Sequence, residues 1–253
     1  MRALIVSDVH LFDLHDRRGR HFFSFLQEQA KSLDRLYVLG DLFDVWPGSS
    51  PLLIKRFQPL FDFFREFVRN GGEVHYVEGN HDFQLGKKLS ESFGFQIHSD
   101  DIRENWEGRR VLLCHGDTVN EHDVTYLKVR RFFRSRWFRL VRAALPDRLA
   151  VYLGTTASRY SRESQLKRPD AEARQGRVKA RYRDIVHALF EKGNDVVVMG
   201  HTHIPEDYRA EVGGRSCRYL NSGDWVKSFT FIRYESGAFS LHNHPLPKPD
   251  LQA

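Results

Sequence analysis

The order of predicted elements indicates an α/β fold in which two mixed sheets pack together with helices outside. Apolar strand-like runs at 36–39 and 74–77 flank a helical pattern with apolar residues at 60–68. Late in the chain, short strands follow one another with only turns between them. A third region, residues 120–188, shows helical patterns only. We expect one domain spanning residues 1–253, with 120–188 inserted as a helical cap.

The composition is that of an ordinary soluble globular protein, with 253 residues, 41% of them hydrophobic and 28% charged. No apolar run approaches the roughly 20 residues of a membrane-spanning helix. The chain begins with a strand-like run, so a cleaved signal peptide is not expected. The two cysteines, Cys114 and Cys217, lie in apolar contexts. They exclude a disulfide framework and favour a reducing, cytoplasmic location.

The positive charge is concentrated in the predicted cap. Between Tyr126 and Arg183 there are 17 basic and 4 acidic residues, against a net charge of +6 for the whole chain. The first helix of this region is predicted to bury one stripe and to carry arginines on the opposite face. The stripe is Val129, Phe133, Trp137, Leu140 and Ala144; the arginines are Arg131, Arg134, Arg139 and Arg142.

Five short signatures rich in Asp, Asn and His each follow an apolar run. They are Asp8-Val9-His10, Gly40-Asp41-Leu42-Phe43-Asp44, Gly79-Asn80-His81-Asp82, Cys114-His115-Gly116-Asp117 and Gly200-His201-Thr202-His203. Each alone is a common accident, and Gly, Asn and Asp also favour turns. Their co-occurrence at successive strand ends predicts one shared metal site.

The residue types in these signatures suit two divalent ions. Asp8 and His10 alternate along an extended segment, so both side chains point the same way. The Asp41 carboxylate is able to bridge two ions about 3.5–4 Å apart. The predicted ligands are Asp8, His10, Asp41, Asn80, His115, His201 and His203. Carboxylate and imidazole without thiolate favour Mn²⁺, Fe²⁺ or Zn²⁺ over a site of oxygens alone.

The five signatures resemble those of the calcineurin-like metallophosphoesterases, and the resemblance covers residues 1–118 and 190–245. It implies an αββα sandwich with a binuclear centre, and we expect the two divalent ions to be Mn²⁺. It also implies attack on phosphorus by a metal-bridged hydroxide. Motif matching assigns one metal to Asp8, His10, Asp41 and His203, and the other to Asp41, Asn80, His115 and His201.

The same resemblance suggests roles for two residues beside Asn80. His81 is expected to protonate the leaving oxygen or to stabilise charge on it, and Asp82 is expected to orient the His81 imidazole. Asp44 is either a support for the site or a polar loop residue.

Finer features resemble the UDP-2,3-diacylglucosamine pyrophosphatases of lipid A synthesis, at residues 40–46, 83–88 and 115–118; residues 221–226 match a related branch. At the position of His81 the better-studied branch has arginine, so the match is to a sibling branch. The resemblance implies release of UMP and 2,3-diacylglucosamine 1-phosphate. The expected substrate contacts are Asp123, Tyr126, Arg159, Arg162 and Lys167.

The basic region allows more than one interpretation. With its aromatic residues it fits an anionic membrane surface, here the cytoplasmic face of an inner membrane, or simply a solvated helix face. An apolar seam between its helices would hold acyl chains. A nuclease or nucleotide phosphodiesterase is the alternative, with the basic region along a phosphate backbone, although no nucleic acid is expected. A non-catalytic scaffold is disfavoured because every ligand is present. Oligomeric state stays open.

Overall fold

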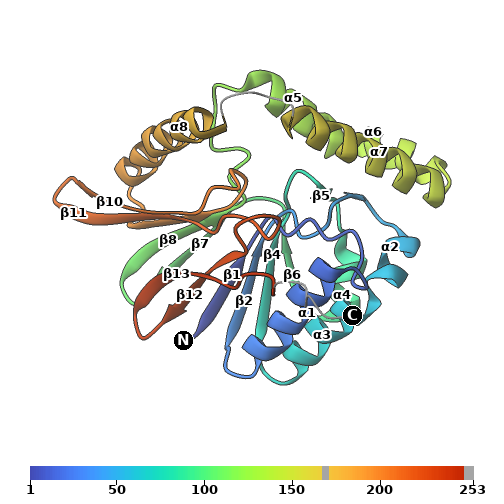
Figure 1. Cartoon of the computed structure of the whole chain (residues 1–253), viewed down its shortest axis with the longest axis horizontal. Helices are drawn as coiled ribbons and strands as arrows, with labels where there is room; N and C mark the ends of the chain where they lie inside the picture. Colours follow the sequence, from blue (N-terminus) through green and yellow to red (C-terminus); the bar gives the residue numbers. More distant parts are fainter. Residues whose placement is uncertain (167–170, 248–253) are drawn as a thin grey trace.

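Two β-sheets pack face to face at the centre of the computed structural model, which describes the backbone of residues 1–166 and 171–247 and the side chains of 1–160 and 172–247 (Figure 1). One sheet has the order β13 (Ala238–Asn243), β12 (Thr230–Glu235), β1 (Ala3–Val6), β2 (Arg35–Leu39), β4 (Glu73–Val77) and β6 (Gln96–His98). The other has the order β10 (Glu206–Val212), β11 (Arg215–Asn221), β9 (Val196–Met199), β8 (Arg109–Cys114) and β7 (Ile102–Trp106).

Both sheets are mixed, as predicted. The strands β1, β2, β4 and β6 are parallel, and so are β8, β9 and β11; β12, β13, β10 and β7 pair antiparallel at the edges. Carboxyl ends of parallel strands meet at one edge of a sheet, so this topology gathers the residues that follow β1, β2, β4, β8 and β9. Three of the strands, β6, β7 and β10, were not predicted from the sequence.

Apolar side chains fill three layers. Ile5 and Leu39 from the six-stranded sheet pack with Leu113 and Val198 from the five-stranded sheet. The outer face of the six-stranded sheet is covered by α1 (Arg17–Ala30), α3 (Gln58–Arg69) and α4 (Lys87–Phe93), with α2 (Pro51–Arg56) beside them. The outer face of the five-stranded sheet is covered by the second half of α8 (Ala171–Glu191), through Val186 and Phe190. The layering is therefore helix, sheet, sheet, helix.

Three helices lie across the strand-end edge of the sandwich: α5 (Val124–Phe133), α6 (Arg136–Ala144) and α7 (Asp147–Leu166) (Figure 1). We call these the cap helices. Beneath them β3 (Trp46–Pro47) and β5 (Asp82–Phe83) form a small two-stranded sheet. Among the described residues no helix combines the length and apolar character needed to cross a membrane.

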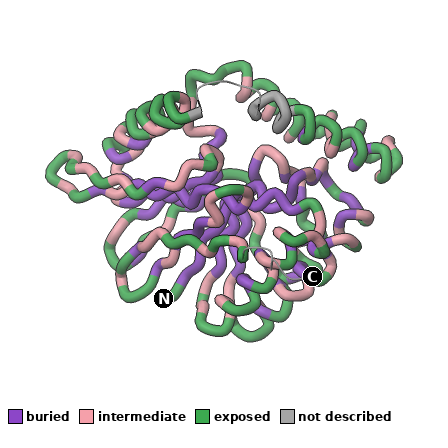
Figure 2. Tube along the Cα trace, viewed as in Figure 1, coloured by how far each residue is buried: buried purple, intermediate pink, exposed green. Residues whose placement is uncertain are grey.

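The prediction of one long first cap helix with a buried stripe was wrong. The chain leaves the helix at Arg134, and the Ser135 side chain caps α6 by accepting a hydrogen bond from the Phe138 N–H at 3.1 Å. Trp137 is 76% exposed, and Val129 and Leu140 are also exposed. Figure 2 shows the cap helices mostly exposed, in contrast to the buried strands. The apolar stripe therefore faces solvent along much of its length.

The prediction that the four arginines form an outer basic face was also wrong for two of them. Arg142 is buried, pairs with Asp147 and donates to the Ser49 carbonyl at 3.1 Å. Arg134 pairs with Glu78 at 2.8 Å. Arg131 and Arg139 are exposed. Two arginines thus attach the cap helices to the sandwich, Arg134 through the buried Glu78 and Arg142 through the Ser49 carbonyl.

Candidate metal centre

The seven predicted ligands converge where β1, β2, β4, β8 and β9 end. Five of them are in the left-handed backbone region, with φ of 52° at Asp8, 50° at His10, 53° at Asp41, 65° at His201 and 59° at His203. A non-glycine residue in this conformation costs on the order of 1–3 kcal/mol, and such residues cluster at functional sites. The turn after each strand is therefore held by its surroundings in a shape that aims the ligand inward.

Two glycines allow the turns to approach one another. A side chain at Gly79 would collide with the Asp41 carboxylate, and one at Gly200 would collide with Ser7 and Asp8. Glycine in these signatures is thus a steric requirement of the site as well as a feature of strand ends.

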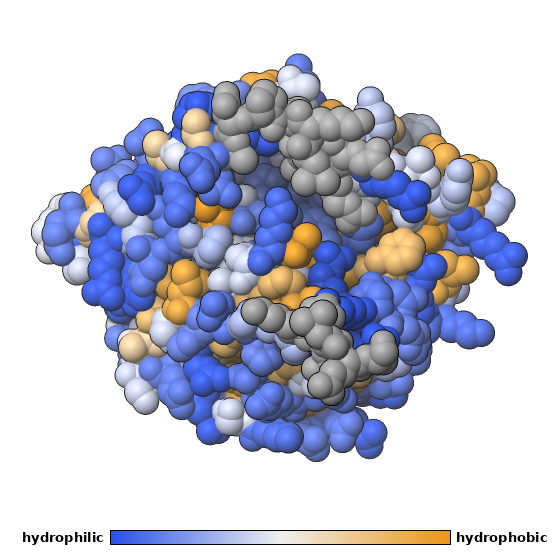
Figure 3. Space-filling view, in the orientation of Figure 1, coloured by the Kyte–Doolittle hydropathy of each residue, from blue (hydrophilic) through white to orange (hydrophobic). Residues whose placement is uncertain are grey.

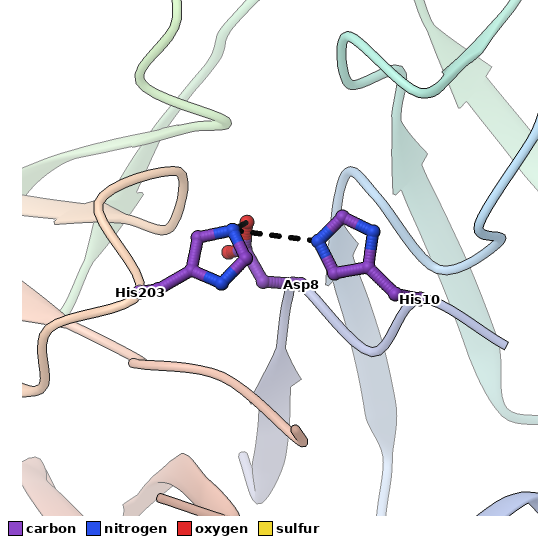
Figure 4. A group of neighbouring side chains, drawn as sticks. All are labelled: Asp8, His10 and His203. Carbon is purple, nitrogen blue, oxygen red and sulfur yellow. Dashed lines mark hydrogen bonds and ion pairs between the residues drawn. The ribbon is translucent and has the colours of Figure 1, made fainter. Parts of the chain in front are cut away.

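The first half of the centre consists of Asp8, His10 and His203 (Figure 4). His203 Nε2 lies 3.3 Å from Asp8 Oδ1 and 3.4 Å from His10 Nε2. The other Asp8 oxygen, Oδ2, accepts hydrogen bonds from the Ser7 hydroxyl and the His201 N–H. Asp8 Oδ1 is buried and receives no hydrogen bond from any described residue. Its lone pairs are thus left for a cation.

The second half consists of Asn80, His115 and His201. The Asn80 amide oxygen lies 2.9 Å from His115 Nε2 and 3.1 Å from His201 Nδ1. His115 Nδ1 donates to the Leu39 carbonyl at 2.9 Å, so in the neutral ring Nε2 carries a lone pair. Two lone pairs facing each other at this distance require a proton or a metal ion between them.

Asp41 lies between the two halves. Its Oδ2 is 3.9 Å from His10 Nε2 and 3.5 Å from His115 Nε2, and its Oδ1 accepts from the His81 N–H at 2.8 Å. One carboxylate oxygen is therefore shared by histidines of both halves, which is the placement expected of a bridging ligand.

The electrostatics of the centre favour positive charge. Burial opposes ionisation of Asp41, but the imidazoles of His115, His81 and His10 lower its pKa overall. Burial opposes protonation of His115, yet Asp41 and Asp8 raise its pKa to about 9. The negative field that retains a proton on His115 would equally retain a divalent cation. Burial lowers the pKa of His201 to about 4, which keeps that imidazole neutral, as a metal ligand must be.

The donor set therefore fits two divalent ions: carboxylate, amide and imidazole atoms converge, and one buried carboxylate oxygen has no donor. The residues that fit one ion are Asp8, His10, Asp41 and His203; those that fit the other are Asp41, Asn80, His115 and His201.

Asp224 supports the site and was not predicted from the sequence. Its Oδ2 lies 3.4 Å from His203 Nδ1, the ring nitrogen that faces away from Asp8. Its Oδ1 accepts from the Lys227 and Ser228 N–H groups at 2.7 and 2.9 Å. A carboxylate behind a histidine fixes the ring and raises its basicity. No spacing rule links residues 203 and 224, because the contact is made only by the fold.

The structure corrects one predicted contact. Both Asp82 oxygens are occupied by the Tyr76 hydroxyl and by the N–H groups of Asp41, Phe43 and Gly79. The His81 ring instead donates from Nδ1 to the Asp44 carbonyl at 2.9 Å. Asp82 therefore fastens the turn after β2 to the turn after β4, and the Asp44 backbone orients His81. The side chain of Asp44 accepts from the Ser158 hydroxyl of α7 at 3.1 Å.

The predicted substrate contacts lie in different places. Tyr126 is beside the centre: its hydroxyl donates to Asp117 at 2.6 Å, and its ring centroid is 6.4 Å from that of His201. Asp123 is exposed and caps α5. Arg159 is exposed on α7. The side chains of Arg162 and Lys167 lie outside the described residues.

An apolar cavity of about 430 Å³ adjoins the centre. Asn80 and His81 form part of its wall, so it opens directly beside the predicted ligands. The rest of the wall comes from β3, β5 and the cap helices and includes Phe83, Phe133, Phe138, Val141, Leu145 and Leu153.

The sequence model of the calcineurin-like phosphoesterase family matches residues 1–205, so the chain belongs to this family. It is therefore a hydrolase that acts on phosphoesters with divalent metal ions. The chain is 30% identical over 246 residues to a UDP-2,3-diacylglucosamine hydrolase of Stenotrophomonas maltophilia, covering 95% of this chain and 98% of the relative. It is 28% identical over 247 residues to the enzyme of that name from Psychromonas ingrahamii, covering 97% and 98%.

Among solved structures, the phosphoesterase Yfce from E. coli aligns over 96% of this chain and 93% of its own, with 15% identity and a TM-score of 0.46.

Proposed function

We propose that this protein hydrolyses the pyrophosphate of UDP-2,3-diacylglucosamine, releasing UMP and 2,3-diacylglucosamine 1-phosphate. The relatives with that name match over nearly their whole length, cap region included. The observation that carries the proposal is the apolar cavity beside the predicted metal centre. A water-soluble phosphodiester has no apolar chain that would fill such a cavity.

The cavity has the chemistry that an acyl chain needs. Burying one methylene group contributes about 0.8 kcal/mol, so even part of a fatty acyl chain would add considerable affinity. Asn80 and His81 lie in its wall, and a substrate held there by its acyl groups would present its phosphates to the metal ligands.

We assign one Mn²⁺ to each half of the centre, with Asp41 shared. Bound there, the ions would neutralise charge on the phosphoryl oxygens and lower the pKa of a coordinated water. The protein orients His81 through the Asp44 carbonyl, which fixes the proton on Nδ1. We therefore assign His81 Nε2 to the leaving oxygen, where an imidazolium donates a proton or stabilises negative charge.

We also propose that the cap helices contact an anionic membrane surface on the cytoplasmic side. Trp137, Leu140 and Val141 are more than half exposed on α6. In Figure 3 apolar surface gathers at the upper right, where Figure 1 places α6 and α7. Arg131, Arg136 and Arg139 are exposed nearby. Each basic residue near such a surface contributes on the order of 1 kcal/mol.

The deciding experiment compares an acylated with a soluble substrate. With Mn²⁺ and detergent, we expect UMP release from UDP-2,3-diacylglucosamine and little turnover of bis-p-nitrophenyl phosphate or single-stranded DNA. Val141→Asp, in the cavity wall, should impair only the acylated substrate. Val129→Asp is the matched control, since Val129 is exposed like Val141 and does not line the cavity. Equal turnover of acylated and soluble esters would instead indicate a generic phosphodiesterase or nuclease.

Membrane contact is tested separately by sedimentation with vesicles containing phosphatidylglycerol. Replacing Arg131, Arg136 and Arg139 with glutamate should release the protein from the vesicles without changing turnover in detergent. Unchanged sedimentation would mean that this basic surface is only solvated.

A further inference from the structure

The helix α5 is attached to the sandwich by polar side chains. Every residue of α5 is described, and none of them is buried. Tyr126 and Arg130 both donate to the buried Asp117 carboxylate, two residues after His115. Arg134, directly after the helix, donates to the segment that follows β4. Several attachments of α5 therefore end on the turns that carry predicted metal ligands; others reach the Ser99 carbonyl, and Phe133 packs against the Phe83 ring.

Arg134 binds the start of the turn after β4 with both terminal nitrogens of its guanidinium group. Nη2 donates to the Gly79 carbonyl at 3.0 Å and to the Glu78 carbonyl at 3.3 Å. Nη1 donates to Glu78 Oε2 at 2.8 Å and to the Ser99 carbonyl at 2.9 Å. These contacts fix the orientation of the two peptide groups that immediately precede Asn80.

The far end of the same turn is held by the same ionic pair and by the end of α5. Glu78 Oε1 accepts from the Leu85 N–H at 2.9 Å, so the Glu78 side chain closes the loop from 78 to 85. The Gln84 amide donates to the Phe133 carbonyl at 3.0 Å. Asn80 and His81 thus lie in a loop whose two ends are both fixed by residues at the end of α5.

We propose that Arg134 is a positioning residue for Asn80 and His81, and that the docking of α5 and metal binding in the Asn80 half of the centre stabilise each other. This inference rests on the proposed two-metal site. The Gly79 carbonyl belongs to the peptide that continues into Asn80, so its rotation would move the Asn80 oxygen away from His115 and His201. Coupling between two sites is reciprocal, so metal bound at Asn80 must in turn hold α5.

Replacing Arg134 with lysine keeps the positive charge at this position and removes the planar geometry of the guanidinium group. Its single ammonium group is able to neutralise Glu78, but it lacks the planar fork that reaches the carboxylate and three carbonyls together. Arg134→Lys should therefore retain the thermal stability that the ion pair provides and lose part of the metal affinity. A purely structural role for Arg134 predicts that the two properties change in parallel.

The experiment is Mn²⁺ titration of the full chain after chelation, followed by calorimetry and electron paramagnetic resonance. The wild type should bind two ions. Glu78→Gln/Arg134→Met removes both charges, so that no unpaired buried carboxylate remains to unfold the protein. In this double variant and in Arg134→Lys, we expect one of the two sites to weaken by roughly 10-fold or more, in the range for residues that support metal ligands. Arg131→Met, an exposed arginine of the same helix, should bind both ions like the wild type.

A second experiment tests the opposite direction of the coupling, the effect of bound metal on α5, by measuring amide hydrogen exchange in that helix. Mn²⁺ should slow exchange there in the wild type and in Arg131→Met, and should have a smaller effect in Arg134→Lys. Wild-type affinity at both sites in the position-134 variants, or equal weakening of both sites, would overturn the inference and leave the two-metal proposal standing. A wild type that binds fewer than two ions would overturn both.

Discussion

The sandwich and the cap helices are built from similar apolar periodicity but hold together in opposite ways. In the sandwich the apolar residues of helices and strands are buried, as with Phe61 of α3 and Leu113 of β8, both fully inaccessible. In α5 and α6 the apolar residues are largely exposed, and polar side chains such as Arg134 and Arg142 make many of the contacts with the sandwich. Periodicity thus identifies an apolar face, and only the fold determines whether protein or a partner covers it. The metal centre belongs to the first region and the predicted lipid contacts to the second.

The largest expected effect is at the bridge of the metal centre. Asp41→Ala removes the oxygen shared by His10 and His115 and leaves converging imidazoles without their central negative charge. We expect loss of measurable turnover and of two-metal binding, assessed by metal analysis after gel filtration. Because the sandwich core is untouched, far-UV circular dichroism should stay that of the wild type. A variant that retains two ions per chain would refute the bridging role.

The next effect concerns His81, which lies at the boundary between the centre and the cavity. His81→Ala should lower kcat by about 10²–10⁴, the range for a group that transfers a proton in the transition state. Metal content should be unchanged, because His81 is not one of the seven ligands. Steady-state assays and metal analysis of the same preparation measure both. Loss of a metal ion from this variant would make His81 a ligand.

Truncating one aromatic side chain in the sandwich and one in the cap helices tests the difference in burial between these two regions. Phe61→Ala empties a fully buried position between α3 and the six-stranded sheet and should cost about 3–5 kcal/mol of unfolding free energy. Trp137→Ala removes a larger side chain that is mostly exposed, so it should change stability by less than about 0.5 kcal/mol. Urea denaturation gives both values. A large loss at Trp137 would show that the cap surface is covered in solution, for instance by another copy of the chain.

A smaller effect than at Phe61 is expected at Asp224, behind the His203 ring. Burial opposes ionisation of Asp224, but the hydrogen bond from His203 and the N–H groups of Ser228 and Lys227 lower its pKa overall. The carboxylate is therefore charged at neutral pH. Asp224→Asn keeps the shape and removes the charge, which should weaken metal binding by roughly 10- to 100-fold. Calorimetric titration with Mn²⁺ tests this. Unchanged affinity would show that Asp224 stabilises its own turn and does not support metal binding through His203.

Much of the site could be predicted from the sequence because each predicted ligand lies within four residues of the end of a strand. Apolar runs such as 36–39 and 196–199 indicate buried parallel strands, and the carboxyl ends of such strands meet at an edge. The seven predicted ligands, from Asp8 to His203, follow from this local rule together with their chemistry. The layering of the fold followed in the same way from the alternation of elements.

What only the tertiary structure decided are the contacts between residues that no local rule connects. The partner of the His81 ring is the Asp44 backbone, that of the His203 ring is Asp224, and that of Arg134 is the segment after β4. Likewise, the exposure of Trp137 depends on the helix break at Ser135, which the apolar spacing of this region does not indicate. Side-chain type and periodicity are properties of the local sequence. Which acceptor an arginine reaches, or which surface an apolar face meets, depends on distances that exist only after folding.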